Sequence, residues 1–114
     1  MSEQEYSFLR NSPMVNEFGK ASRFIEVLRQ CKQELKERYK VKSLGIFGSY
    51  VRNEQKKGSD LDILVEFDEP PSLLRFLQLE HYLSDLLGVR VDLVMKDVLK
   101  PAIGRRILSE VVSV

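Results

Sequence analysis

GSYVRNEQKKGSDLDILVEF, residues 48–67, runs from a Gly-Ser corner through a polar loop into a mostly apolar strand that begins with two aspartates. The run LDILVEF, residues 61–67, is typical of a strand buried on both faces. Two carboxylates, Asp60 and Asp62, are more than the start of a strand needs for solubility. The stretch therefore predicts a strand whose first residues belong to a functional site.

The residues before this stretch predict a helix and a strand. Apolar residues at helical spacing mark one face of a helix over residues 21–40, namely Phe24, Leu28, Cys31, Leu35 and Tyr39. VKSLGIF, residues 41–47, is short and rich in apolar residues, so it predicts a strand despite Gly45 in its interior. Residues 1–20 show no clear period and are expected to form an N-terminal arm or a short helix. The remaining residues, 21–114, are expected to form one domain.

The residues after the stretch predict a helix, a strand and a last helix. Two prolines end the strand, and Ser72 can cap a helix that stops at Gly88. VRVDLVM, residues 89–95, predicts a third strand, and Pro101 suits the first turn of a helix through about residue 107. The order predicts an α/β (α+β) fold, with helices packed on a small mixed sheet of three or more strands. The second and third strands should be parallel through a right-handed crossover.

Length and composition limit the function classes. The chain has 114 residues, with 18 basic against 17 acidic residues and a net charge of +1. This balance gives no reason to expect a nucleic-acid or membrane partner. The single cysteine excludes an internal disulfide, and the polar first residues lack the pattern of a signal peptide. The apolar runs are far shorter than the ~20 residues that cross a bilayer. We therefore expect a cytoplasmic protein.

The two aspartates predict a bound cation. Residues two apart in a strand share a face, so Asp60 and Asp62 project from the same side of the sheet. Carboxylates about 5 Å apart repel by roughly 3 kcal/mol at an effective dielectric constant of 20. Mg²⁺ prefers carboxylate oxygens together with substrate phosphates. The alternative is that Asp60 caps the loop while Asp62 lies on a solvated strand edge.

The Gly-Ser corner favours the functional interpretation. Gly48 permits a tight turn, after which free backbone N–H groups and the Ser49 hydroxyl can face an anion. Arg52 lies one turn further on and could bring a mobile positive charge to the same phosphates. A Gly-Ser pair ten residues before Asp-x-Asp should occur by chance in on the order of one chain in 1,000. The pattern predicts a nucleotide-phosphate site.

A third carboxylate is expected for phosphoryl-type transfer, to hold a metal ion and take the proton of the attacking hydroxyl. Asp92 lies in the middle of the third predicted strand, which should place it beside Asp60 and Asp62. An ionised aspartate among apolar residues is costly unless it is paired or metal-bound. The alternative partner is Arg90 or another basic side chain.

At these residues the sequence resembles the DNA polymerase β-type nucleotidyltransferase superfamily and, within it, the minimal nucleotidyltransferase (MNT) domain proteins. The resemblance runs from about residue 22 to the C-terminus and is most specific in residues 48–67 and in VDLV downstream. It implies a polymerase β-like nucleotidyltransferase fold, with ATP as substrate and two Mg²⁺ ions as cofactors. Residues 1–20 lie outside it.

The resemblance also implies a role for each candidate residue. Gly48 and Ser49 match the nucleotide-phosphate corner of the family, and Arg52 occupies a place where arginine is common. The implied metal ligands and catalytic carboxylates are Asp60, Asp62 and Asp92. The last of these would also act as the base for the incoming hydroxyl.

Minimal members of the family resemble antitoxins that transfer AMP from ATP to a tyrosine of a HEPN-domain ribonuclease toxin. The resemblance therefore implies a HEPN toxin as partner, held in an oligomeric complex. Two other functions stay open. The chain could silence its partner by masking it without catalysis, or it could transfer a nucleotide to a small molecule.

Overall fold

The structure is a computed structural model that describes the backbone from residue 13 and the side chains from residue 20, in both cases to residue 114. Its helices are α2 (Pro13–Gln30), α3 (Lys32–Tyr39), α4 (Leu73–Leu87), the short 3₁₀ helix η1 (Lys96–Val98) and α5 (Pro101–Glu110). Its strands are β1 (Val41–Phe47), β2 (Leu61–Phe67), β3 (Val91–Met95) and β4 (Val112–Ser113). The first 12 residues of the expected arm lie outside the described residues.

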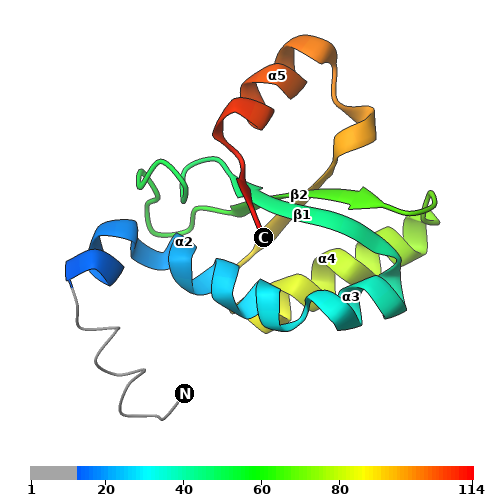
Figure 1. Ribbon diagram of the computed structural model, residues 1–114, viewed down its shortest axis with the longest axis horizontal. Coiled ribbons are helices and arrows are strands. Elements are labelled where there is room, and N and C mark those ends of the chain that lie inside the picture. Colours follow the sequence, from blue (N-terminus) through cyan, green and yellow to red (C-terminus); the bar gives the residue numbers. More distant parts are fainter. Residues whose placement is uncertain (1–12) are drawn as a thin grey trace.

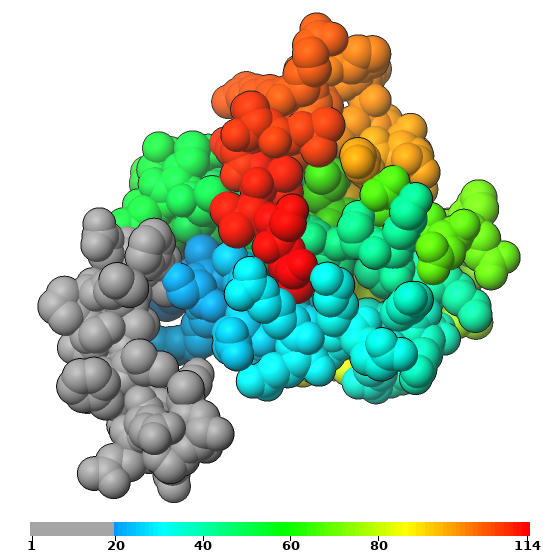
Figure 2. Space-filling model, viewed as in Figure 1, coloured from blue at the N-terminus to red at the C-terminus, as the bar shows by residue number. Residues whose placement is uncertain are grey.

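The four strands form one mixed sheet in the order β3-β2-β1-β4. β2 and β3 are parallel, as expected, and β1 is antiparallel to both of its neighbours. Helices α2, α3 and α4 lie on one side of this sheet and α5 lies on the other (Figure 1). The C-terminal residues, red in Figure 2, extend from α5 towards the start of α3, where the Val114 carbonyl accepts from the Lys32 Nζ atom at 3.3 Å. The expected fold class is therefore confirmed.

The first helical segment differs from the expectation. It begins at Pro13 and is interrupted at Cys31, so that two helices replace the single helix expected over residues 21–40. The Cys31 N–H is shared between the carbonyls of Val27 and Leu28, at 3.2 Å from each. The apolar face is nevertheless confirmed, because Phe24, Leu28, Leu35 and Tyr39 are buried. Cys31 itself is partly buried and packs against the core from the same face.

Several element boundaries agree with the sequence. β1 and β2 have the predicted bounds, and the Ser72 hydroxyl accepts a hydrogen bond from the Arg75 N–H at 3.1 Å to cap α4. Gly88 ends α4 in the left-handed conformation, with φ of 70°. The third strand begins two residues later than expected, and α5 runs three residues further, to Glu110. The apolar tail forms β4, a strand that the sequence analysis did not predict.

The core lies between the sheet and the helices α2, α3 and α4. Its fully buried side chains are Leu28, Leu35, Ile46, Leu61, Ile63, Val65, Leu79 and Leu83. α4 also covers the free edge of β3 with two polar side chains. The Ser84 hydroxyl accepts from the Val91 N–H at 3.0 Å, and the Glu80 carboxylate accepts from the Leu93 N–H at 2.9 Å. Among the described residues, no helix combines the length and apolar character needed to cross a membrane.

Gly45 lets the C-terminal segment approach β1 closely. A Cβ added at Gly45 would lie 2.5 Å from the Val111 Cγ2 atom and 3.2 Å from the Val112 carbonyl oxygen. We expect Gly45→Ala to displace β4 and to lower the free energy of unfolding by about 1–3 kcal/mol. Gly104→Ala is the matched control, because its Cβ would meet Leu99 at an ordinary 3.6 Å. Chemical denaturation measures the free energy of unfolding of both variants. Equal values for the two variants would contradict the prediction.

Candidate active site

The Gly-Ser corner at the end of β1 forms a tight turn of backbone donors. Gly48 is buried and has a φ of 83°, and a Cβ added there would collide with the carboxylate of Asp62. The N–H groups of Val51 and Arg52 both donate to the Gly48 carbonyl, at 3.1 and 3.2 Å. Among the described residues, no backbone carbonyl or side chain accepts from the N–H groups of Ser49 and Tyr50. The corner therefore offers free donors to an anion.

The sheet brings the predicted carboxylates to this corner. Asp62 is the register partner of Phe47 in β1 and of Asp92 in β3. Asp60 precedes β2, and its carboxylate lies 3.8 Å from the Nε atom of Arg90. The alternative that Arg90 neutralises Asp92 is therefore not what the structure shows. Asp92 is exposed on the edge strand, so the desolvation cost expected for it does not arise.

Asp62 lies in an environment that disfavours its negative charge. Partial burial, followed by the negative charges of Asp92 and Asp60, raises the pKa of Asp62 from 3.8 to about 6. The Arg52 guanidinium opposes this rise, and the Glu110 carboxylate adds to it. A carboxylate held in this way is stabilised by a cation that binds beside it. The arrangement therefore favours a cation that arrives with the substrate.

The oxygen atoms of the three aspartates are ligands of the type that Mg²⁺ prefers, but the side chains do not surround a metal position. In the part of the chain that the structure describes, no three acidic, histidine or cysteine side chains converge closely enough to hold a metal ion. Mg²⁺ usually binds through one or two carboxylates and keeps substrate phosphates and water as its other ligands. Asp62 and Asp92, on adjacent strands, fit such a partial site, with Asp60 next to it.

Arg52 is held by two carboxylates at the corner. Its Nη1 atom donates to both oxygens of Glu110, at 3.1 and 3.0 Å, and its Nε atom donates to Glu54 at 3.2 Å. Glu110 also accepts from the N–H of Gly48 at 3.0 Å. The sequence analysis did not identify Glu110, which lies 62 residues after Gly48. No local pattern joins positions so far apart.

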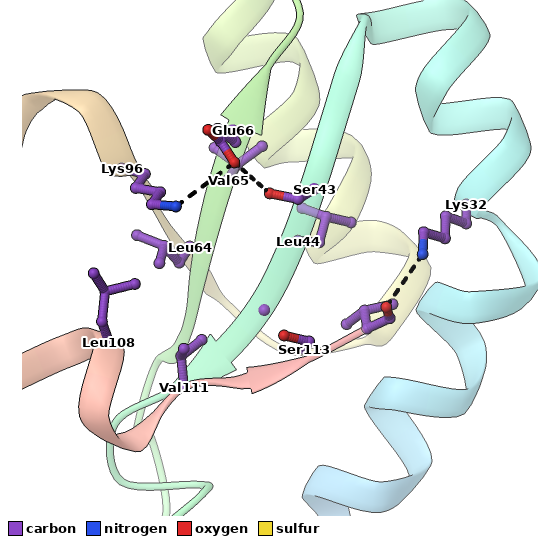
Figure 3. Close-up of a pocket in the computed structure, with 12 residues that line it drawn as sticks. Lys32, Ser43, Leu44, Leu64, Val65, Glu66, Lys96, Leu108, Val111 and Ser113 are labelled. Atoms are coloured by element: carbon purple, nitrogen blue, oxygen red, sulfur yellow. Dashed lines mark hydrogen bonds and ion pairs between the residues drawn. The ribbon is translucent and has the colours of Figure 1, made fainter.

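A hollow of about 310 Å³ lies under α5 (Figure 3). Leu64 and Glu66 of β2 line it, and strand alternation puts Asp62 on the same face of the sheet. The apolar wall of the hollow includes Leu44, Leu64, Leu108 and Val111. At one end, Glu66 accepts a hydrogen bond from Ser43 at 2.9 Å and lies 3.8 Å from the Lys96 Nζ atom. None of the six predicted site residues lines this hollow. The aspartates thus lie outside it, at the end of the sheet.

Asp62→Asn is expected to stabilise the folded protein at about pH 7.5 in the presence of a chelator. The raised pKa means that the folded protein binds the Asp62 proton more tightly than the unfolded chain does. Stability is therefore lost as the pH rises from about 4 to above 6. The ionised Asp62 side chain lowers the free energy of unfolding by at most about 3 kcal/mol, and solvent screening makes the loss smaller. We expect the melting temperature to rise by about 5 °C.

The control for this prediction is the pH dependence of the same measurement. Below about pH 3, Asp62 is protonated in both states, so Asp62→Asn should give no gain. Asp97→Asn, at an exposed position of η1, should leave the melting temperature unchanged at every pH. A gain for Asp62→Asn that is equal at low and neutral pH would contradict the electrostatic explanation.

Comparisons with known proteins agree with this geometry. Residues 28–114 match the family described as the nucleotidyltransferase domain. The protein adenylyltransferase MntA of Thermococcus cleftensis is 58% identical over 88 residues, which cover 77% of this chain and 89% of that protein. A solved structure described as a proposed minimal nucleotidyltransferase has 36% identity and a TM-score of 0.63, and the match covers 80% of this chain and 88% of that one.

A more distant similarity concerns a toxin-antitoxin complex. A chain of the complex between a tri-AMPylated HEPN toxin of Shewanella oneidensis and an MNT antitoxin matches with 19% identity and a TM-score of 0.59. That match covers 79% of this chain and 70% of the other, and at this identity it shows a common fold alone. The family match covers most of the chain, including the corner and all three aspartates. The chain therefore belongs to the nucleotidyltransferase domain family, among the minimal nucleotidyltransferases.

Proposed function

We propose that the protein transfers AMP from ATP to the hydroxyl group of a tyrosine on a HEPN-type toxin. By this modification it acts as the antitoxin of that toxin. One observation carries the proposal. The crowded carboxylate of Asp62 lies against a corner whose Ser49 and Tyr50 N–H groups have no partner among the described residues. An acidic group that favours a cation, next to donors that favour an anion, suits a metal-bound triphosphate.

The proposed reaction is an in-line displacement at the α-phosphate. The N–H groups of Ser49 and Tyr50, with Arg52, hold the phosphates beyond the scissile bond. The hydroxyl oxygen bonds to the α-phosphorus as the bond to the bridging oxygen breaks, and pyrophosphate leaves with that electron pair. Asp92, exposed beside Asp62, accepts the hydroxyl proton. Asp62 and Asp92, with Asp60 next to them, would hold magnesium together with the substrate phosphates, whose charge the ion would neutralise.

The choice of a protein acceptor rests on two kinds of support. Asp92 is exposed at the edge of the sheet, so that a partner bound over the site would exclude water from it. The relative from Thermococcus cleftensis is named a protein adenylyltransferase. The fold also resembles a chain of a HEPN-MNT complex. We propose an oligomeric complex with the toxin, in the cytoplasm.

The experiment that tests the proposal is a transfer assay in a lysate of the source organism. The purified protein is incubated with the lysate, Mg²⁺ and ATP labelled at the α-phosphate, and labelled proteins are identified by gel and mass spectrometry. One labelled protein that carries AMP on tyrosine is the expected result. Label on a small molecule instead would replace the proposed acceptor. No label, with a partner that still co-purifies, would favour masking without catalysis.

A further inference from the structure

The end of α5 lies at the phosphate corner because β4 fixes it there. Val112 and Ser113 of β4 pair with Ile46 and Gly45 of β1, which lie two and three residues before Gly48. This pairing begins two residues after Glu110, the last residue of α5. The position of Glu110 is therefore set by backbone pairing and not by its own contacts alone.

The Glu110 carboxylate joins the corner to Arg52. One of its oxygens accepts from the Gly48 N–H at 3.0 Å, and both accept from the Arg52 Nη1 atom, at 3.1 and 3.0 Å. The Glu110 side chain is only 24% exposed. Charge-assisted hydrogen bonds are stronger than neutral ones. Both carboxylate oxygens accept from Arg52 while one of them also accepts from Gly48, so the contact holds the guanidinium against the corner.

The contact leaves the donors of the site available. The Nε atom of Arg52 donates to Glu54 at 3.2 Å, whereas its Nη2 atom has no partner among the described residues. The Glu110 carboxylate does not accept from the N–H groups of Ser49 and Tyr50, which have no hydrogen-bond partner among the described residues. Arg52 is thus held at two atoms and keeps one edge for an incoming anion.

We propose that Glu110 is a positioning residue for the nucleotide, holding the Arg52 guanidinium against the corner so that its free edge meets the phosphates of ATP. This inference rests on the proposed function and adds a residue that acts on substrate binding through Arg52. A carboxylate that instead competed with the phosphates would have the opposite effect on affinity. The sign of the effect therefore decides between the two roles.

The test is calorimetric titration of Mg²⁺-ATP into four proteins: the wild type, Glu110→Ala, Arg52→Ala and the double variant. We expect Glu110→Ala to weaken ATP binding about tenfold, because Arg52 loses its orientation. We expect the double variant to bind as weakly as Arg52→Ala, because Glu110 acts through Arg52. If the role of Glu110 were merely structural, the double variant would instead lose the sum of the two single variants' losses in ATP-binding free energy.

Two further variants control for folding and for charge. Glu66→Ala removes a carboxylate that is also 24% exposed, and that is bound to Ser43 and Lys96 at the far end of the sheet (Figure 3). It should leave ATP affinity unchanged. Glu110→Gln keeps an acceptor for the Gly48 N–H while losing the charge that holds Arg52. It should fold and still bind ATP more weakly, which covers the case in which Glu110→Ala does not fold.

The outcomes separate this inference from the proposed function. ATP binding by the wild type, with equal or tighter binding by the Glu110 variants, would overturn the inference and leave the proposed function standing. Additive losses in the double variant would also overturn it. A wild-type protein that binds no ATP would overturn the proposed function together with the inference.

Discussion

Replacing both Asp60 and Asp62 by alanine is expected to lower the rate of AMP transfer at least about 10³-fold. Asp62 lies against the phosphate corner, and the negative charge of Asp60 helps to raise the pKa of the Asp62 carboxyl. Without both carboxylates, nothing on β2 would hold a cation against the triphosphate. The measurement is the initial rate of label transfer from α-labelled ATP to the partner protein.

The control for the double variant separates chemistry from folding. Neither aspartate is fully buried, so the variant should unfold at a temperature no lower than the wild type. Asp97→Ala, on the exposed η1 segment, should retain the full rate. An undiminished rate in the double variant would rule out the assignment of these carboxylates. Full protection of cells by the inactive double variant would favour masking of the toxin.

Gly48→Ala is expected to have the second largest effect, on both stability and activity. Its φ of 83° costs a residue with a Cβ about 1–2 kcal/mol, and the added methyl group would collide with the Asp62 carboxylate. The collision has to displace either β2 or the corner. We expect the melting temperature to fall by at least about 8 °C and AMP transfer to fall at least about 100-fold. Thermal unfolding and the transfer assay measure the two effects.

Gly58→Ala is the matched control for this prediction. Gly58 also has a left-handed backbone, with φ of 88°, but no described atom lies within 4 Å of an added Cβ. This variant should therefore show the backbone cost alone, about 1–2 kcal/mol, and transfer AMP at nearly the wild-type rate. If the two glycine variants lost activity equally, the collision with Asp62 would not explain the requirement for Gly48.

The sequence predicted those elements whose ends carry local signals. Ser72 and Gly88 bound α4, and the corner ends β1, because capping and turn residues act within a few positions of themselves. The interruption at Cys31 has no such signal, since no proline or glycine stands there. β4 was missed because a two-residue strand has no period of its own and forms only when β1 is beside it.

The site was predictable to the extent that topology places its residues. The parallel pairing of β2 and β3 brings Asp92 beside Asp62, as the predicted crossover required. The exposure of Asp92 was not predictable, because the sequence does not say which strand lies at the edge. Glu110 was missed for a related reason. Its partners Gly48 and Arg52 lie about 60 residues earlier, and only the folded chain brings them together.

The covered edge of β3 limits how the protein can associate with others. Two outward-facing donors of that strand, the N–H groups of Val91 and Leu93, are already bonded to Ser84 and Glu80 of α4. An unpaired strand edge invites a foreign strand to join the sheet, which leads to aggregation or to β-augmentation. At this edge the donors that such a strand would need are occupied. A partner that binds at β3 must therefore use side-chain surfaces, and the sheet is protected against growth into fibrils from that side.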